Sequence, residues 1–490
     1  MSAKTNATKL SFSVETSLGT LAGSPTWTEA GWTGIGSIGS TVSKTEIKPI
    51  NQNAMNEKPI ITDLDSTLEY SNDLTISGFL NHAQGFFRSD IQEQTQAEPT
   101  AVVASDDSFT HVGLGVTIAE NSLIFARNYT PADNNGLHVV TTGGSTASTL
   151  TTSVLVDEAS PPTNSRIDVV GFQGTAGDIQ LDSENNLTAT TLDFTTDMSV
   201  EVGSWIYIGG GTSATTFAGA TYTGLCRVRV VEAKKLTLDK RPWTVGAADT
   251  GATKTIQLFT GNFIRNVPRD DGDYNAESYT FEAEYYGLED SSATIYKYPE
   301  GARGNEMSLN FPLSDKAAIS WSFITTDTPN PTTAQATGTR YTLYDNEGFG
   351  TSSDCTQLRI KDSSLVDYTT TFKSLDLTVG NTVSAEKVLC SLGAAEMNDG
   401  NFMVSGSASV LMTDENMISA VRNNETLSLD YAIANGDGAL AFDIPSLTFD
   451  AANDELPEDA SIIINFDIKA FRDSFFDFVM SCTHFSYLPV

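Results

Sequence analysis

The sequence predicts a mainly β protein in which one structural unit is present twice. Thr, Ser, Gly and Val are abundant, and alternating apolar and polar residues recur between clusters of Gly, Asp and Asn, as in strands joined by turns. A stretch that leads from an extended segment through polar residues into a short apolar helix is present at residues 66–83 and again at residues 408–424. Two copies of one unit indicate a pseudo-symmetric building block, three chains of which could close a six-fold ring.

Two segments show the strand period most plainly, residues 279–286 and residues 462–469. In each of them apolar side chains alternate with polar ones. Because successive side chains of a strand point to opposite faces, each segment is expected to bury one face and to keep the other polar. The polar positions include Glu282, Glu284, Asn465 and Asp467.

Two helices are predicted, one from residue 73 to about residue 87 and one from residue 414 to about residue 424. Each begins at Asp and near Asn or Thr, whose side chains can accept the free N–H groups of a first helical turn. A pair of strands follows each helix. The predicted pairs are residues 278–287 with residues 307–311, and residues 426–432 with residues 440–449.

The composition changes between the two copies. From residue 101 to residue 263, short strands alternate with longer connections of Gly, Ser, Thr and Asn, which predicts an inserted region of small β modules. A linker rich in Pro and Thr, residues 326–338, separates the two halves. The predicted division is a first domain over residues 1–100 and 264–327, an insertion over residues 101–263, and a second domain over residues 328–490.

The chain has 490 residues, enough for several domains, and carries 62 Asp and Glu against 28 Lys and Arg. Its net charge of −34 repels nucleic acid phosphates and anionic membranes, so sequence-specific DNA or RNA binding is not expected. We find no export leader and no apolar run of bilayer length, which favours a cytoplasmic protein. The four cysteines lie far apart in sequence, which predicts neither a disulfide frame nor a zinc site.

No set of residues has the spacing of a catalytic or metal site. Residues 34–39 match the GxGxxG spelling of a dinucleotide loop, but no helical pattern follows them. The four histidines are scattered, and the acidic run at residues 270–273 lacks the closing Glu of a calcium loop. The pair Glu282 and Glu284 has no adjoining aromatic platform of the kind that glycosidases use. We therefore expect no enzyme activity, no cofactor and no bound metal.

Four stretches carry a resemblance to a known family. Residues 12–27 place an acidic residue and a Gly-Thr step before Pro and Trp, and residues 371–381 combine a strand with an Asn turn. Residues 413–418 have the pattern of a capped helix start, and residues 442–447 that of a strand with an embedded proline. In these features the chain resembles the major tail tube proteins of long, non-contractile-tailed bacteriophages (siphophages), in the group whose subunit carries two tube-fold domains. The resemblance covers roughly the first 100 residues and the last 220; the long insertion and the acidic balance depart from it.

The resemblance implies two tail-tube-type β-sandwich or β-barrel domains, each with one flanking helix. It implies a structural virion protein, the major tail tube subunit, of which three copies form a pseudo-hexameric ring. Stacked rings would enclose the channel for DNA ejection, and DNA would pass without specific binding. The implied partners are further copies of the chain and the tape measure, tail terminator and distal tail proteins, with no membrane involved. The subunit would be assembled in the cytoplasm of the host bacterium and located in the virion tail.

The resemblance also implies where stacked rings touch. The matching loops are residues 42–60 and residues 380–400, two polar excursions long enough to leave their own sheets. The predicted contact residues are Lys44, Lys48, Asn51, Asn53, Glu386, Lys387 and Asn398.

The channel is expected to be lined by polar strand faces that repel phosphate. The predicted lining residues are Glu282, Glu284, Asp430, Asn465 and Asp467. The insertion is expected on the outer surface of the tube, where it could touch host glycans or widen the tube. The aromatic segment over residues 471–490 needs a cover, either its own domain or, as favoured here, a neighbouring subunit.

Two other classes of protein stay open at this point. A β-rich surface or glycan-binding module of the adhesin type would share the Thr and Gly composition and would remain monomeric. A carbohydrate-active enzyme would hydrolyse a glycan, which a glycan panel would detect.

Overall fold

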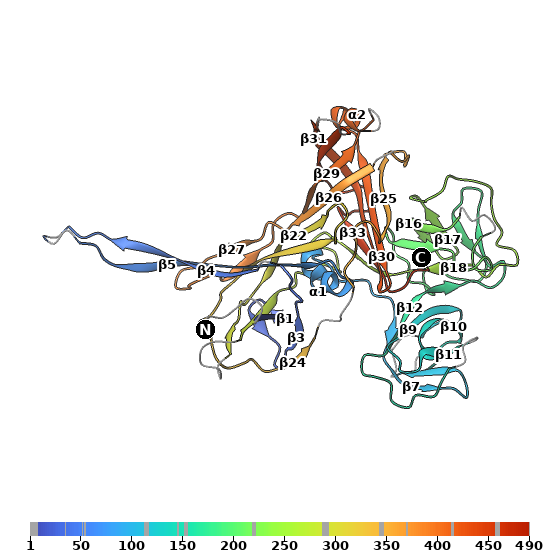
Figure 1. The fold of residues 1–490 in the computed structure, drawn as a ribbon, viewed down its shortest axis with the longest axis horizontal. Coiled ribbons are helices and arrows are strands. Elements are labelled where there is room, and N and C mark those ends of the chain that lie inside the picture. The colour runs from blue at the N-terminus through green and yellow to red at the C-terminus, as the bar shows by residue number, and fades with distance from the viewer. Residues whose placement is uncertain are drawn as a thin grey trace.

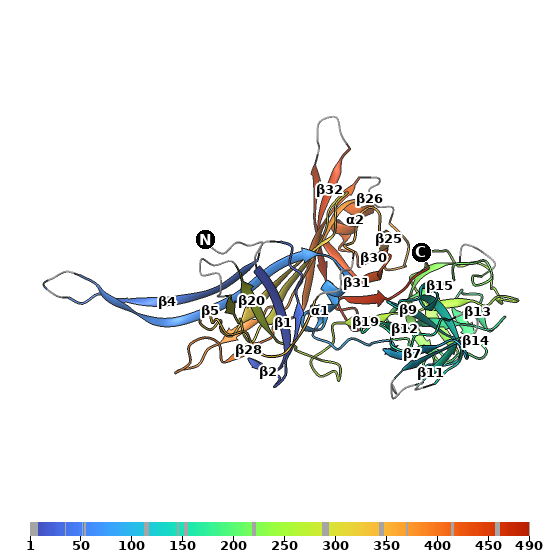
Figure 2. The ribbon, with the colours of Figure 1, turned by 60° about the horizontal axis from the view of Figure 1, so that its bottom comes forward.

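Figure 1 shows a computed structural model of the chain. It describes residues 8–34, 36–50, 52, 55–111, 117–144, 147–150, 155–217, 222–286, 294–342, 347–368, 371–412, 416–455 and 461–489. A central β body carries a long thin hairpin on one side and a separate β lobe on the other (Figures 1 and 2).

One layer of the body is an antiparallel sheet that we call the long sheet. Its strands lie in the order β4-β5-β23-β22-β26-β29-β32-β31. Their bounds are Ser37–Ile47 (β4), Glu57–Asp73 (β5), Ala318–Thr325 (β23), Arg303–Phe311 (β22), Thr371–Gly380 (β26), Met403–Leu411 (β29), Ile463–Ala470 (β32) and Gly438–Glu455 (β31). A short hairpin, β27 (Ser384–Glu386) with β28 (Glu396–Asn398), extends from the turn between β26 and β29.

Two smaller groups of strands form the opposite layer. The first has the order β21-β20-β1-β3-β24, with β2 beside β1. Its bounds are Ile295–Lys297 (β21), Tyr279–Tyr285 (β20), Thr8–Ser17 (β1), Thr26–Glu29 (β3), Thr339–Tyr341 (β24) and Thr20–Leu21 (β2). The second consists of the first part of β31 with β25 (Cys355–Asp362), β30 (Leu427–Asn435), β33 (Ser481–Phe485) and β19 (Asn262–Arg265).

The apolar residues of both layers meet in one core. Trp321 and Phe466 of the long sheet belong to the same buried cluster as Phe12 and Phe281 of the first group and Phe442 of the second. The alternation that predicted a buried face on residues 462–469 is confirmed, since Ile464, Phe466 and Ile468 are buried while Asp467 and Lys469 are exposed. The body is therefore a β-sandwich, as the fold class predicted.

The repeated unit is visible in the topology. The first half runs through β1, β4, β5, a helix, β20, β22 and β23, and the second half through β25, β26, β29, a helix, β30, β31 and β32. In the long sheet the first half has the order β4-β5-β23-β22 and the second has the matching order β26-β29-β32-β31. The pairing of β1 with β20 likewise matches that of β25 with β30. Because the halves share one sheet and one core, the predicted division into separate domains stays a prediction.

Both predicted helices are present, with shorter bounds. Helix α1 covers Ile76–Phe87, and the hydroxyl of its N-cap Thr75 accepts a hydrogen bond from the N–H of Gly78 at 3.0 Å. Asp73 is the last residue of β5 rather than the cap, and it forms an ion pair with Lys316 at 2.7 Å. Helix α2 covers Asn416–Asn423; the predicted start at residue 414 lies outside the described residues.

One of the two predicted strand pairs is wrong. β30 pairs with β31 as expected, but β20 pairs with β1 and β21 and not with β22. In the second half, the single long strand β31 runs through both layers and pairs with β30 in one of them. In the first half, two separate strands take the place of β31, namely β21 in the layer of β20 and β22 in the long sheet. The partner of β20 is therefore the short strand β21, which the sequence pattern did not reveal.

The inserted lobe is built from strands β6 to β18 and has two cores of its own. The strands are Gln96–Ala97 (β6), Pro99–Val103 (β7), Ser108–His111 (β8), Ser122–Arg127 (β9), Gly136–Thr142 (β10), Ala147–Leu150 (β11), Arg166–Gln173 (β12), Ile179–Leu181 (β13), Leu187–Ala189 (β14), Trp205–Ile208 (β15), Gly224–Glu232 (β16), Lys235–Leu238 (β17) and Gln257–Phe259 (β18), with a 3₁₀ turn at Ala132–Asn134.

The lobe is seated on the body by apolar contacts. Trp205 and Phe259 of the lobe share a buried cluster with Ala432 of β30, Ala441 of β31 and Phe485 of β33. These small and aromatic residues lie on the face of β30, β31 and β33 that points away from the central core. The lobe therefore covers the outer face of the second strand group.

The aromatic C-terminal segment is mostly buried within its own chain. Phe476 and Phe478 pack with Phe263 of β19, and Phe485 packs against the lobe. Phe471 and Phe475 remain exposed. The preference for a neighbouring subunit as the cover is therefore wrong for the buried part of this segment, because β19 and the lobe already cover it.

Two buried histidines predict an acid-sensitive fold. Burial lowers the pKa of His82 to about 3, and burial with the nearby Arg127 and Arg166 lowers the pKa of His484 to about 3. Between pH 6.5 and 3 the unfolded chain therefore binds protons that the folded chain does not, so stability falls as the pH is lowered through this window. We expect each histidine to cost about 2 kcal/mol between pH 6.5 and pH 5.

Urea unfolding of the wild type at pH 7 and pH 5 measures this loss. His484→Gln should make the pH dependence less steep without abolishing it, because residue 484 then gains no proton in the unfolded chain while His82 still does. A variant that keeps the wild-type slope would contradict the assignment.

Candidate assembly surfaces

The side of the long sheet that faces away from the core is covered by small polar side chains, and we call it the polar face. Alternate residues of β22, β26 and β29 point to it, and hydrogen bonds tie neighbouring strands together across it. Ser308 and Thr378 hydroxyls lie 3.1 Å apart, and the Ser409 hydroxyl donates to Asn465 Oδ1 at 2.5 Å. The residues at these positions are Thr67, Glu69, Ser71, Ser320, Ser322, Glu306, Ser308, Asn310, Asp376, Thr378, Ser405, Ser407, Ser409, Asn465, Asp467 and Lys469.

The polar face is acidic. At these positions the carboxylates are Glu69, Glu306, Asp376 and Asp467, and the one cation is Lys469, which forms an ion pair with Asp450. Asn310 and Ser407 donate hydrogen bonds to Asp376, which hold its carboxylate in place without neutralising it. The face therefore presents hydroxyls and negative charge over strands from both halves of the chain.

Two of the predicted channel residues, Asn465 and Asp467, lie on this polar face. They are opposite Ser409 and Ser407 of β29. Whether the face lines a channel stays a prediction. The other acidic members of the face, Glu69, Glu306 and Asp376, were missed by the sequence analysis, because their strands show the same weak alternation of Ser, Thr and Asp as many surface strands.

Glu282 and Glu284 lie elsewhere, and the expectation of a wet polar face on β20 is wrong. Glu282 is fully buried and accepts hydrogen bonds from Arg340 Nη2 at 2.7 Å and Tyr298 Oη at 2.9 Å. Gln335 donates to Glu284 at 2.9 Å. The linker residue Gln335 and Arg340 of β24 thus lie over the acidic face of β20, so this face is internal.

Burial and the adjacent Glu282 raise the pKa of Glu284. Like charges side by side are costly, and here Arg340 offsets part of that cost with its hydrogen bonds to Glu282. Because both carboxylates are buried in the subunit, they do not form an exposed acidic surface.

Asp430 is also internal, within a buried ionic cluster between the lobe and the body. The cluster has three cations and three carboxylates, so its formal charge is zero. Its members are Arg227, Asp239 and Lys240 of the lobe and Arg359, Asp430 and Asp443 of the body.

The distances in the cluster are those of strong ion pairs. Lys240 Nζ lies 2.6 Å from Asp443 Oδ1 and 3.4 Å from Asp430 Oδ1, and Arg227 bridges Asp239 at 2.7 Å and Asp443 at 2.8 Å. Burial opposes ionisation of Asp430, but Lys240 and Arg359 outweigh it and lower the pKa of this carboxyl. Buried charges are tolerated only when paired in this way, so the cluster fixes the lobe on the body.

The predicted contact loop over residues 42–60 is the outer part of a β-hairpin formed by β4 and β5, which we call the arm. It extends far from the body in both views (Figures 1 and 2). Lys44 and Lys48 are exposed on it, and Lys48 lies 2.9 Å from Glu46; Asn51 and Asn53 lie outside the described residues. Met55, Ile60 and Ile61 are 71%, 59% and 51% exposed. Exposed apolar side chains in such a number are typical of a surface that contacts another molecule.

The second predicted contact loop braces the base of the arm. Lys387, just after β27, lies 2.7 Å from Asp63 and 2.6 Å from Asp65 of β5. Asn398 donates to Glu386 at 2.8 Å and closes the β27–β28 hairpin. The two loops extend from equivalent hairpins, β4–β5 and β26–β29, and the structure brings them together. Their contact with another ring stays a prediction.

Replacing Lys387 with glutamine is expected to loosen the arm base without unfolding the body, because exposed ion pairs contribute little to global stability. Lys387 lowers the pKa of Asp63, so in the variant Asp63 should titrate at a higher pH. Amide hydrogen exchange at the base of β4 and β5 should become faster. Lys48→Gln, at an exposed pair farther along the same arm, is the matched control and should leave the base unchanged.

A comparison with protein families complements this geometry: the model of the phage tail tube protein family matches residues 5–470. The chain belongs to the phage tail tube protein family. The comparison with curated proteins gives no match. As a tail tube protein, the chain is a structural component of the virion tail and assembles with itself and with other tail proteins.

The described residues of this tail tube protein contain no group of three or more His, Cys, Asp and Glu side chains placed to hold a metal. In the same residues, none of the helices is both long enough and apolar enough to cross a bilayer. The end of the stretch 34–39 already lies in β4, which begins at Ser37, so these glycines do not open a dinucleotide-binding helix.

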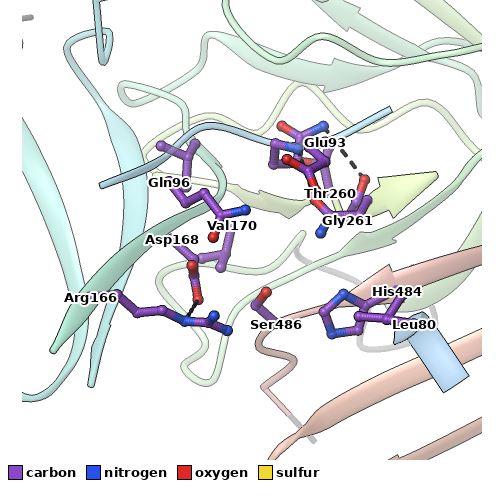
Figure 3. A pocket seen from close by; sticks show the side chains of 13 residues that line it. Leu80, Glu93, Gln96, Arg166, Asp168, Val170, Thr260, Gly261, His484 and Ser486 are labelled. Carbon is purple, nitrogen blue, oxygen red and sulfur yellow. Dashed lines mark hydrogen bonds and ion pairs between the residues drawn. The ribbon is translucent and has the colours of Figure 1, made fainter. Parts of the chain in front are cut away.

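Figure 3 shows a small cavity of about 110 Å³ at the joint between the lobe and the body of the tail tube protein. Arg166 and Asp168 enter it from β12, with Arg166 Nε 3.4 Å from Asp168 Oδ2, and His484 enters it from β33. The low pKa of His484, caused by burial, keeps its ring neutral at physiological pH. The cavity belongs to the packing between lobe and body.

Proposed function

We propose that the chain is the major tail tube subunit of a siphophage, and that its polar face lines the channel through which DNA is ejected. Three copies form a pseudo-hexameric ring, and the rings stack into a tube. The observation that supports this most directly is the internal repeat, since two equivalent four-strand units lie side by side in one sheet. Three such chains supply six units, which suit a six-fold wall.

The polar face has the chemistry that a DNA channel needs. Its carboxylates repel phosphate and its hydroxyls keep the surface hydrated, while Lys469 is paired with Asp450. DNA therefore slides without specific binding. In this assignment the residues that face the channel are Asn465 and the carboxylates Glu69, Glu306, Asp376 and Asp467. Glu282, Glu284 and Asp430 are buried inside the subunit and stabilise its fold.

The position of the lobe follows from the same sandwich. The polar face and the lobe lie on opposite layers, because the lobe covers the outer face of β30, β31 and β33. With the polar face toward the channel, the lobe is on the outside of the tube. The arm and the β27–β28 hairpin then extend from the edge of the wall toward the next ring.

The subunit acts as a structural part rather than as an enzyme. It assembles in the cytoplasm of the host bacterium with the tape measure, tail terminator and distal tail proteins, without a membrane. These partners are inferred from the proposed function and not from contacts in the structure of the single chain.

Electron cryo-microscopy of tubes formed by the purified protein tests the proposal. We expect a hollow tube with Asp376 and Asp467 at the channel and the lobe at the outer surface. A tube with the lobe inside, or a protein that stays monomeric at all concentrations, would overturn it.

A further inference from the structure

Three side chains of the buried ionic cluster are placed for a covalent step. Asp430 of β30 and Asp443 of β31 lie directly opposite each other on neighbouring strands, an arrangement in which two like charges repel. Lys240 enters from the lobe, and its Nζ lies 2.6 Å from Asp443 Oδ1 and 3.4 Å from Asp430 Oδ1. One amine thus contacts two carboxylates on the same face of the sheet.

The site excludes water and holds the amine still. Lys240 and Asp443 are fully buried, and Asp430 is 1% exposed. The N–H of Lys240 donates to Asp239 Oδ1 at 2.6 Å, and its carbonyl oxygen accepts from the N–H of Arg227 at 3.0 Å. Groups held roughly 3–3.5 Å apart react faster than free ones, because they lose little further entropy when they meet.

We propose that Lys240 and Asp443 form an intramolecular amide, an isopeptide bond that fastens the lobe to the body. The bond forms after folding, and the ion pairs described above are those of the chain before it forms. The bond lies within one chain, so the inference goes beyond the proposed function and does not depend on the formation of a tube.

The step needs no co-reactant. The ammonium of Lys240 gives one proton to Asp430, and the lone pair of the neutral amine then attacks the carboxyl carbon of Asp443. A C–N bond forms, and the C–O bond to Oδ1 breaks with its electron pair on the oxygen. This oxygen leaves as water with two protons from the nitrogen, one of them carried by Asp430. The net change converts an ammonium and a carboxylate to an amide and one water, with charge conserved.

Asp430 is placed to carry the proton. Burial opposes its ionisation, but Lys240 and Arg359 outweigh burial and lower the pKa of this carboxyl, so it begins as a carboxylate. Its Oδ1 faces Lys240 Nζ and accepts no hydrogen bond within the described residues, which leaves a lone pair for the proton. A carboxyl group with a low pKa is a good acid once protonated, which suits release of the leaving oxygen as water.

Arg227 stabilises the charge that develops during the attack. Its Nη1 donates to Asp443 Oδ2 at 2.8 Å, the oxygen that stays in the amide. A fixed guanidinium beside this oxygen stabilises the negative charge on it in the tetrahedral intermediate. After loss of water the cluster remains neutral, with two cations and two carboxylates: Arg227, Arg359, Asp239 and Asp430.

Mass spectrometry of the purified chain under denaturing conditions tests the bond. We expect a chain lighter than its sequence mass by one water and, after trypsin, a branched peptide that carries both Lys240 and Asp443. The peptide is needed because Asp437, which precedes Gly438, can also lose one water by cyclising onto the chain. The full sequence mass, or a water loss located at Asp437 alone, would overturn the inference.

Two variants separate the chemistry from the fold. Lys240→Arg keeps the positive charge, but a guanidinium stays protonated and does not attack a carboxyl group, so this variant should have its full sequence mass. Asp430→Asn keeps the size of the side chain and removes the proton carrier, so the bond should form roughly 100-fold more slowly. Lys235→Met, at a more exposed ion pair of the same lobe, is the matched control and should keep the water loss.

Each variant has an outcome that contradicts the inference. A branched peptide at residue 240 in Lys240→Arg would overturn the bond, and a wild-type rate in Asp430→Asn would overturn the role of Asp430 as proton carrier. The mass of the wild-type chain decides by itself whether the bond exists, so a variant that fails to fold does not leave the inference untested.

Discussion

Lys240→Met is expected to destabilise the subunit by about 3–5 kcal/mol, the usual cost of removing one partner from a buried ion pair. Lys240 is fully buried and is shared by Asp443 and Asp430. The methionine fills similar space but leaves the cluster with two cations and three carboxylates, so one negative charge is buried without compensation. Urea unfolding, followed by tryptophan fluorescence, measures the loss.

Lys235→Met is the matched control. Lys235 forms an ion pair with Asp182 at 2.9 Å in the same lobe, but its side chain is 36% exposed. The same substitution should therefore cost no more than about 1 kcal/mol. Equal losses at the two positions would show that the cluster is not behaving as a buried network.

A second substitution separates charge from packing. Lys240→Met combined with Asp443→Asn removes one cation and one carboxylate, so the remaining cluster is neutral again. We expect the double variant to be more stable than the sum of the single losses indicates, because the two residues are in direct contact. Simple additivity would contradict the coupling of these two charges.

The cluster also changes how the insertion should be removed. Deleting residues 101–263 takes away Arg227, Asp239 and Lys240 and leaves Asp430 and Asp443 facing Arg359 alone. The deletion also opens these carboxylates and the apolar face of β30, β31 and β33 to water. A collapse of such a deletion would therefore report the loss of this interface and not a role of the lobe in ring formation.

Local patterns in the sequence predicted the elements that depend on neighbouring residues. The alternation at Ile464, Phe466 and Ile468, the presence of α1 and the β30–β31 hairpin are each set by a few adjacent side chains. The repeat was also visible, because the sequences that precede the two helices have the same pattern of residue types. These features need no knowledge of what the rest of the chain does.

What covers a strand face could not be predicted in this way. A period of two shows that Glu282 and Glu284 share a face, but Arg340 of β24, which covers it, is 58 positions from Glu282. Asp430 and Asp443 are polar positions on strands of the second half, and the lysine between them comes from the insertion, 203 positions before Asp443. Burial of a charge is a long-range property, so each of these carboxylates looked like a surface residue.

Replacing Glu306, Asp376 and Asp467 together with lysine is expected to make assembled tubes retain duplex DNA that wild-type tubes release. The three positions lie on β22, β26 and β32, so the new cations would lie across the whole polar face. Each lysine that contacts a phosphate releases counterions, so the affinity gained should fall with salt by about 0.9 log units per contact and per tenfold increase in salt. Protection of a short duplex from nuclease, measured in tubes over a range of salt concentrations, reports DNA held inside the channel.

Glu120, Asp133 and Glu232 are exposed carboxylates of the lobe, and their replacement by lysine changes the net charge by the same amount. With the lobe on the outside of the tube, DNA attracted by these lysines stays open to the nuclease, so this control should give no protection. The opposite pattern, with protection by the lobe variant and none by the polar-face variant, would place the lobe in the channel. Because the two surfaces lie on opposite layers of one sandwich, they cannot both face the channel, and the nuclease result decides between them.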